Sequence, residues 1–237
     1  MRMRSFIIHL TRATARSANV ARLLEILPEA EVFEAVDSQD PAFLETAPAG
    51  AAPLHHPPYP FGLSQPEIAC FMSHRACWQK IAEGEADFAL IAEDDMIVDP
   101  VPFAAALDLA QRYATDESFI RLPAKDRERS AGAIARQGGA AMFLPKTIGL
   151  QAVCQIVGRR AAQRLLRASE RFDRPVDTTL QMHWVTGQPV HTVHPSGISE
   201  MGAPSTIQSR TRPSDLLMRE MRRASYRAQI RRKPQLA

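Results

Sequence analysis

The stretch FALIAEDDMIV, residues 88–98, constrains the fold more than any other part of the sequence. It begins with a continuous apolar run, which is typical of a strand covered on both faces in a parallel sheet. Three adjacent carboxylates follow this run, on Glu93, Asp94 and Asp95. Their negative charges repel one another, so water, a cation or a cationic side chain must compensate them. The stretch therefore predicts a buried strand with a strongly acidic tip.

Strand and helix patterns alternate around this segment. Strands are predicted at 4–10, 31–37, 118–123, 140–145, 151–157 and 189–195, and helices at 11–27, 64–84, 101–113, 158–170 and 176–184. The helix at 64–84 has the clearest start, because Ser64 and Glu67 form a capping-box pattern with Pro66 in the first turn. The alternation is typical of an α/β layer fold with a mostly parallel central sheet flanked by helices.

Length and composition set the domain organisation. A chain of 237 residues that is 45% hydrophobic can bury one sizeable core. We expect a single domain over residues 1–209, with the proline-rich segment 46–66 as a surface loop, and a separate tail over 210–237. The apolar run near the N-terminus is too short for a secretory signal or a membrane span. Three cysteines without CxxC spacing predict reduced thiols in a cytosolic protein.

The acidic tip has a chemical interpretation. Ligands of open parallel sheets bind outside the carboxyl ends of the strands, where this tip is predicted to lie. Side chains alternate along a strand, so Glu93 and Asp95 are expected on one side and Asp94 on the other. Two carboxylates on one side can hold a hard divalent cation, Mn²⁺ or Mg²⁺, together with substrate phosphates. The alternative is a solvated acidic loop, or a cluster that caps the following helix.

Residues 63–98, LSQPEIACFMSHRACWQKIAEGEADFALIAEDDMIV, resemble the signature of glycosyltransferase family 25, the lipooligosaccharide (LPS) glycosyltransferases. In that family a Leu-Ser-x-x-Glu-Ile-Gly/Ala-Cys stretch leads through Ser-His to a Glu-Asp-Asp triplet. Further pieces agree in order, namely FIIHLTRATAR, VFEAVD, IVGRRAAQRLL with the later PVD, and GAPSTIQSR. The resemblance covers about residues 4–210. It implies a GT-A-like nucleotide-sugar fold and the inverting transfer of a sugar, often galactose, from a UDP donor.

The resemblance also implies site residues. The triplet matches the family's acidic metal and diphosphate motif, with Glu93 and Asp95 as metal ligands. Arg12 and Arg16 lie where the first strand opens onto the donor, and a guanidinium suits phosphate oxygens. Asp37, at the end of the next strand, could accept a hydrogen bond from uridine. The remaining members of the expected nucleotide-sugar-binding set are His9, Thr11, His74 and Asp94.

Some of these residues have plainer interpretations. His74 falls on the apolar face of helix 64–84, where a core histidine is equally expected. Without the resemblance, Arg12 and Arg16 are ordinary surface arginines and Asp37 is a turn residue. His9 and Gln155 depart from the family pattern, which usually has Asn and Tyr at these places.

Inverting transfer needs a base that deprotonates the acceptor hydroxyl. Asp177 in the PVD segment matches the family's late aspartate and is the candidate, although aspartate is also a good helix N-cap there. His191 or His194, beside the last predicted strand, could supply a third metal ligand, although no family motif supports this role.

The tail carries the basic character of the chain. From Arg210 onward there are nine Lys and Arg residues against two acids, a net charge of +7, which leaves −4 for residues 1–209. Residues 214–233 predict an amphipathic helix with Leu216, Leu217 and Met221 on one side. We expect the tail to dock on an anionic membrane surface. A solvated helix is the main alternative, and nucleic acid is not an expected partner.

The sequence thus predicts a metal-dependent, inverting glycosyltransferase that moves a sugar, such as galactose or another hexose, from a UDP-sugar to an LPS or other surface-glycan acceptor. It is expected in the cytoplasm, peripheral on the inner face of the cytoplasmic membrane. Two alternatives remain open: a catalytically silent relative that binds nucleotide or glycan, and a metal-dependent phosphohydrolase.

Overall fold

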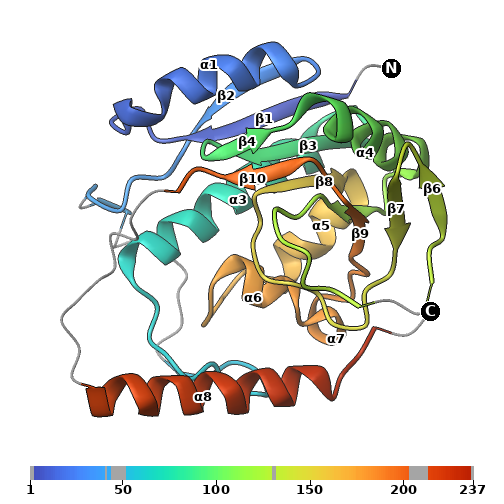
Figure 1. Cartoon of the computed structure of the whole chain (residues 1–237). Helices are drawn as coiled ribbons and strands as arrows, with labels where there is room; N and C mark the ends of the chain where they lie inside the picture. Colours follow the sequence, from blue (N-terminus) through green and yellow to red (C-terminus); the bar gives the residue numbers. More distant parts are fainter. Residues whose placement is uncertain (1–2, 41, 44–51, 130–131, 203–212, 236–237) are drawn as a thin grey trace.

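A mixed eight-stranded sheet forms the centre of the molecule (Figure 1). The computed structural model describes residues 3–40, 42–43, 52–129, 132–202 and 213–235, without the side chains of 213–216. Four parts of the prediction lie outside these described parts: the domain boundary at 209, most of the segment GAPSTIQSR, the side chain of Leu216 and the start of the proline-rich loop.

The main sheet has the strand order β2-β1-β3-β8-β5-β9-β7-β6, and a small second sheet pairs β10 with β4. The main strands are β1 (Arg4–His9), β2 (Ala30–Glu34), β3 (Phe88–Glu93), β5 (Phe119–Arg121), β6 (Ala135–Gln137), β7 (Ala140–Phe143), β8 (Cys154–Gly158) and β9 (His191–His194). Pairings of β8 with β3 and β5, and of β7 with β9 and β6, are antiparallel. Since only β7 and β8 are reversed, six of the eight strands run in one direction, and the predicted mostly parallel sheet is confirmed.

Helices cover both faces of this sheet. The α-helices of the described residues are α1 (Ser17–Ile26), α3 (Gln65–Glu83), α4 (Pro100–Tyr113), α5 (Arg159–Ala168), α6 (Val176–Leu180), α7 (His183–Thr186) and α8 (Pro213–Arg231), of which α8 contributes to neither hydrophobic core. One core packs α1 and α4 on the sheet, through residues such as Leu23, Leu90 and Leu109. The other packs α3, α5 and α6 on the opposite face, around Trp78 and Ile91. Neighbouring residues of β3 therefore enter different cores, which confirms that this strand is covered on both faces.

Several boundaries differ from the sequence prediction. The strand predicted at 31–37 ends at Glu34, so Asp37 lies three residues beyond it. The segment 11–27 starts with a 3-10 turn, Thr14–Arg16, and the single helix predicted at 176–184 is two short helices, α6 and α7. The short strands β4 (Met96–Val98), β6 and β10 (Ile198–Glu200) were not predicted.

The helix α3 begins as its sequence predicts. The Ser64 backbone N–H donates to the Glu67 carboxylate at 2.8 Å, and the capping box is complete. Its buried face carries Phe71, His74 and Trp78 against the sheet. Because this face packs on the sheet, His74 lies next to Glu93, the last residue of β3.

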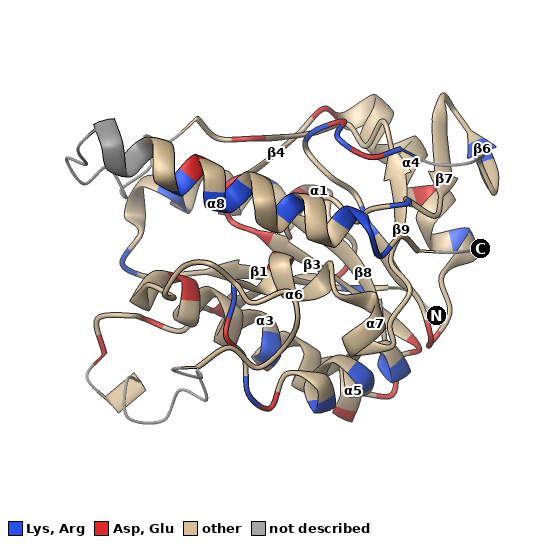
Figure 2. Cartoon of the chain, turned by 90° about the horizontal axis from the view of Figure 1, so that it is seen from below, with Lys and Arg blue, Asp and Glu red and all other residues tan. Residues whose placement is uncertain are grey.

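The basic helix α8 lies along the body of the protein on the side of α3 and α6 (Figures 1 and 2). Tyr226 and Ile230 are buried, and the Tyr226 hydroxyl contacts Arg174 Nη1 at 3.0 Å. Arg174 is fully buried and also donates to the carbonyl of Pro57. The tail is thus joined to the proline-rich loop through one arginine. None of the described helices is long and apolar enough to cross a membrane.

Candidate functional site

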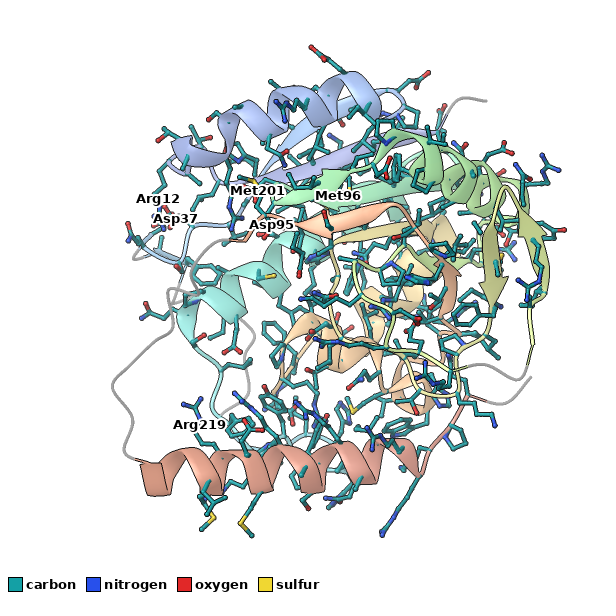
Figure 3. All side chains as sticks on the ribbon, in the orientation of Figure 1. Arg12, Asp37, Asp95, Met96, Met201 and Arg219 are labelled. Carbon is teal, nitrogen blue, oxygen red and sulfur yellow. The ribbon has the colours of Figure 1, made fainter. Side chains whose placement is uncertain are left out.

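The acidic tip sits at a turn that β10 holds in place. The strand β3 ends at Glu93, and Asp94 and Asp95 form the turn into β4. The strand β10 pairs antiparallel with β4, and the backbone N–H of Met201 donates to the carbonyl of Asp95 at 2.8 Å (Figure 3). Because the strand ends before the second acid, the expected alternation of side chains does not govern the triplet. Each carboxylate instead follows its own set of partners.

Asp94 is the compensated acid of the triplet. It is buried, and its Oδ2 lies 2.7 Å from His9 Nδ1, while Arg16 pairs with its Oδ1. The side chain of Asn19 donates to the carbonyls of Asp94 and Met96, at 2.9 and 2.8 Å, which fixes the turn. Burial disfavours the charge of Arg16, but the bond to Asp94 and the nearby acids outweigh it and raise the pKa of Arg16. His9, Arg16 and Asp94, three of the residues predicted to bind the nucleotide-sugar, therefore lie together.

Glu93 points toward α3. Its Oε1 lies 3.1 Å from His74 Nε2, and His74 Nδ1 lies 2.9 Å from the amide nitrogen of Gln155. Because that amide can only donate, Nδ1 accepts and the opposite ring nitrogen carries the proton toward Glu93. Ligand atoms of Cys70, His74 and Glu93 lie within 4.8 Å of one another. Cys70 was missed as a site residue, although its spacing of four residues from His74 on one helix face predicts the proximity.

Asp95 is the acid that lacks compensation. Its Oδ1 is buried and has no hydrogen-bond partner among the described residues, and its only ion pair is with Arg16 Nη2 at 3.5 Å. Burial, followed by the negative charge of Glu93, raises the pKa of Asp95 to about 6, against the opposing effect of Arg16. A buried carboxylate oxygen without a donor, beside a second carboxylate, suits a hard cation that ligates oxygen. The unpartnered oxygen of Asp95, under the charge of Glu93, is therefore chemically suited to a divalent ion.

The other residues predicted to bind the nucleotide-sugar, apart from His74, lie just beyond the ends of β1 and β2. Arg12 Nε and Nη2 donate to the two oxygens of Asp37, at 2.7 and 2.9 Å, on the exposed surface (Figure 3). This hydrogen bonding lowers the pKa of Asp37. Thr11 donates to Glu34 through its backbone N–H, at 3.1 Å, and through its hydroxyl. Arg12 and Asp37 are thus paired with each other, so a ligand would have to replace this ion pair.

A cavity of about 360 Å³ joins the acidic tip to the predicted base. Glu93 and Asp177 both line it, although they come from β3 and α6. Asp177 is not the N-cap of α6, because Pro175 occupies that position. Its Oδ1 accepts the backbone N–H of Thr178 at 2.6 Å, and its Oδ2 accepts that of Gln151 at 3.0 Å. Oδ1 also accepts from the Thr178 hydroxyl at 3.1 Å, so these bonds orient the carboxylate and leave a lone pair free on Oδ2.

Glu200 is a member of this cavity that the sequence did not indicate. Its Oε2 pairs with Lys125 Nζ and its Oε1 accepts from the side chain of Gln151, both at 2.6 Å. The proposed histidine ligands lie elsewhere. His191 and His194 belong to β9, three strands from β3, roughly 14 Å away at about 4.8 Å per strand. They are therefore too distant to share an ion with Glu93, and that prediction is wrong.

Comparison with known proteins assigns the chain to a family. The family model of Glycosyltransferase family 25 (LPS biosynthesis protein) matches residues 3–180, about three quarters of the chain. The chain belongs to glycosyltransferase family 25. The predicted resemblance is confirmed, and the protein is a sugar-transferring enzyme of a family connected with LPS biosynthesis.

Two further comparisons do not add to this family assignment. No match was found among curated protein sequences. Among solved structures, the crystal structure of 4-diphosphocytidyl-2C-methyl-D-erythritol synthase is similar at 16% sequence identity and a TM-score of 0.41. That alignment covers 94% of this chain and 99% of the other.

This family 25 glycosyltransferase accommodates its unusual residues within the site. His9 contacts Asp94 of the acidic tip, and Gln155 contacts His74, which in turn contacts Glu93. Gly158, the last residue of β8, has a steric role. A Cβ at this position would lie 2.3 Å from the carbonyl oxygen of Asp116, so no side chain fits without a shift of the backbone.

Proposed function

We propose that the enzyme transfers a hexose, such as galactose, from a UDP-sugar to an LPS or other surface-glycan acceptor, with inversion and with a divalent cation. The observation that supports this proposal is the cavity lined by both Glu93 and Asp177, because the proposed cation ligand and the proposed base then face one space. A GT-A-like arrangement, with the donor at the carboxyl ends of β1, β2 and β3, fits this placement.

Glu93 and Asp95 would hold the cation, Mn²⁺ or Mg²⁺. When bound, it supplies positive charge that stabilises the negative charge developing on the departing diphosphate. The chain adds Arg16, a partly exposed guanidinium that Asp94 orients toward the same place. Because His9 also holds Asp94, the three residues keep Arg16 ready to donate to phosphate oxygens.

Arg12 and Asp37 would bind the nucleotide by exchanging their mutual ion pair for ligand contacts. Arg12 suits a phosphate oxygen, and Asp37 suits a donor N–H of the uracil ring. Thr11, fixed by Glu34, lies beside them at the end of β1. Since the pair is exposed, little free energy opposes this exchange.

Asp177 would act as the base. Inversion requires the acceptor hydroxyl to attack from the side opposite the leaving group, with a carboxylate that removes its proton. Asp177 lines the cavity with oriented oxygens, whereas Glu200 in the same cavity is held in an ion pair by Lys125. The acceptor hydroxyl would therefore enter between Asp177 and the donor side of the cleft.

The tail would bring the enzyme to its acceptor. Leu217, Met218 and Met221 on α8 are exposed by 66%, 52% and 58%, and they share the helix with many arginines (Figure 2). An apolar stripe beside basic residues suits the anionic inner face of the cytoplasmic membrane. Flotation with anionic vesicles should recover the enzyme and lose the triple variant L217S/M218S/M221S. Equal recovery with neutral and anionic vesicles would contradict electrostatic docking.

The decisive experiment measures UDP release from candidate UDP-sugars with Mn²⁺ and a glycan acceptor. Turnover should be lost in Glu93→Ala and Asp95→Ala and kept in Glu85→Ala, an exposed acid on the loop before β3. Binding of a UDP-sugar without UDP release would favour the catalytically silent relative. Phosphate release without any acceptor would favour the phosphohydrolase. The anomeric configuration of the product, read by NMR, tests inversion.

A further inference from the structure

A second and larger cavity, of about 580 Å³, lies between α8 and the body of the protein. Four arginines line it: Arg127, Arg223, Arg227 and Arg231. No Asp or Glu is among its described lining residues. Such a concave surface with one sign of charge raises the local concentration of ligands of the opposite sign. The cavity is therefore suited to an anion that is small enough to enter.

Three of these arginines are available to bind an anion. Within the described parts of the chain, Arg127, Arg227 and Arg231 form no ion pair, and all three are exposed. Arg223 is the exception, since it pairs with Glu220 on the surface of α8 and also lies over the ring of Phe61. Three guanidinium groups without carboxylate partners converge on one space, and each can donate two hydrogen bonds to a phosphate or carboxylate.

Aromatic side chains give the cavity a second property. Tyr59 stands between Phe61 and Tyr226, with ring centroids 5.6 Å from each in edge-on contacts. All three line the cavity. Burial, followed by the charges of Glu67 and Asp177, raises the pKa of Tyr59 to about 12, so its hydroxyl remains a donor at neutral pH. Aromatic faces beside hydroxyl donors and guanidinium groups suit a sugar ring that carries an acidic group.

The two cavities are neighbours. Tyr59, Leu150 and Thr178 line both, and Thr178 is bonded to the predicted base Asp177. A ligand whose acidic group lies among the arginines can therefore extend toward Asp177. The helix α6, which carries Asp177, lies between α8 and the strands β1 and β2, at whose ends the donor is proposed to bind (Figure 1).

We infer that this cavity is an acceptor subsite for a saccharide bearing a phosphate or carboxylate group, with α8 as one of its walls. The inference rests on the proposed function for the role of the adjacent cleft. It gives the tail a part in substrate recognition, because α8 turns Arg227 and Arg231 toward the body while its apolar stripe faces solvent. It also names the acceptor class as an acidic sugar.

The test is an NMR titration of the full-length protein with glucose 6-phosphate, glucuronate and glucose. The two anions should bind at least about tenfold more tightly than glucose, as expected for charge-assisted hydrogen bonds. The variant R227Q/R231Q should lose this preference. The matched control R222Q/R232Q removes the same charge from exposed positions that do not line the cavity, and it should keep the preference.

Equal binding of glucose and glucose 6-phosphate by the native protein would overturn the inference, and so would equal losses in the two variants. Loss of anionic-vesicle flotation in R227Q/R231Q, with the sugar preference unchanged, would assign the arginines to a membrane and also overturn it. A parallel titration with UDP and Mn²⁺ separates the two proposals. If UDP does not bind but the sugar preference holds, the proposed donor site fails while the anion site stands.

Discussion

Asp95→Asn should stabilise the metal-free protein at neutral pH, although it removes a predicted metal ligand. The folded chain buries the Asp95 carboxylate without a hydrogen-bond donor for Oδ1 and beside the charge of Glu93. An asparagine has a similar shape and no charge, so it escapes both the burial and the repulsion. Replacing a buried acid that is well compensated would have the opposite effect.

The magnitude follows from the pKa. Burial and Glu93 raise the pKa of Asp95 from 3.8 to about 6, and about two pKa units correspond to at most about 3 kcal/mol. Asp95 is partly exposed and Arg16 lies near, so we expect a gain of about 1–3 kcal/mol in the free energy of unfolding. Between pH 3.8 and about 6 the folded state binds more protons than the unfolded state. The contribution of Asp95 to stability therefore falls as the pH rises through this window and is constant above it.

Urea denaturation in EDTA at pH 7.5 and at pH 4 measures both effects. The advantage of Asp95→Asn should appear at pH 7.5 and shrink to a few tenths of a kcal/mol at pH 4. The matched variant Asp94→Asn should instead lose about 2–3 kcal/mol, because His9 and Arg16 lose a charged partner. With Mn²⁺, the melting temperature should rise in the native protein and not in Asp95→Asn. If Asp95→Asn destabilises the EDTA-treated protein as Asp94→Asn does, the view of Asp95 as an uncompensated acid is wrong.

Three further predictions concern other parts of the molecule. Asp177→Asn should lower kcat by about 100-fold or more with an unchanged Kd for UDP, as measured by UDP release and calorimetry; an unchanged kcat would remove it as the base. Arg174→Leu should cost about 3–5 kcal/mol in urea denaturation because its buried partner carboxylate loses its cation, whereas the exposed Arg171→Leu should change stability by less than about 0.5 kcal/mol. Gly158→Ala should cost about 1–3 kcal/mol because its Cβ would meet the Asp116 carbonyl, and a neutral result would show that this loop moves freely.

The parts of the fold that could be predicted are those with local causes. The start of α3 follows from a capping box within four residues, and the position of β3 follows from an unbroken apolar run. Both signals act between neighbours in the chain, so tertiary packing had little to change. The acidic tip was found for the same reason, because three adjacent carboxylates are visible in the sequence itself.

The arrangement of the site depended on pairings that local patterns do not contain. Glu200 reaches the cavity only because β10 pairs with β4, about a hundred residues earlier in the chain, and each strand has three residues. Strands this short carry too few positions for alternation to show. Strand alternation is no guide to Asp94 and Asp95 either, since the turn begins directly after Glu93.

The tail also shows that local patterns predict a helix but not its long-range partners. Its amphipathic pattern and charge predicted a helix that faces solvent or membrane, and α8 does leave Leu217, Met218 and Met221 exposed. Its other face packs on the body through Tyr226 and Ile230. Their spacing of four residues predicts a shared helix face, but the partner of Tyr226 is a buried arginine far away in the chain, which no local pattern indicates.

The unequal treatment of Asp94 and Asp95 argues for ligand binding at the tip more strongly than the acidic cluster alone. If the protein needed only to tolerate three adjacent acids, Arg16 could pair closely with Asp95, which is within reach at 3.5 Å. Arg16 and His9 are instead both directed to Asp94, and Asn19 fixes the backbone of that turn. The structure thus uses His9 and Arg16 to hold Asp94 still, while Asp95 keeps only the longer contact with Arg16 and a buried oxygen without a donor. Such a local destabilisation persists where a bound partner relieves it, and a cation at Asp95 would do so beside Arg16, the residue proposed to bind the diphosphate.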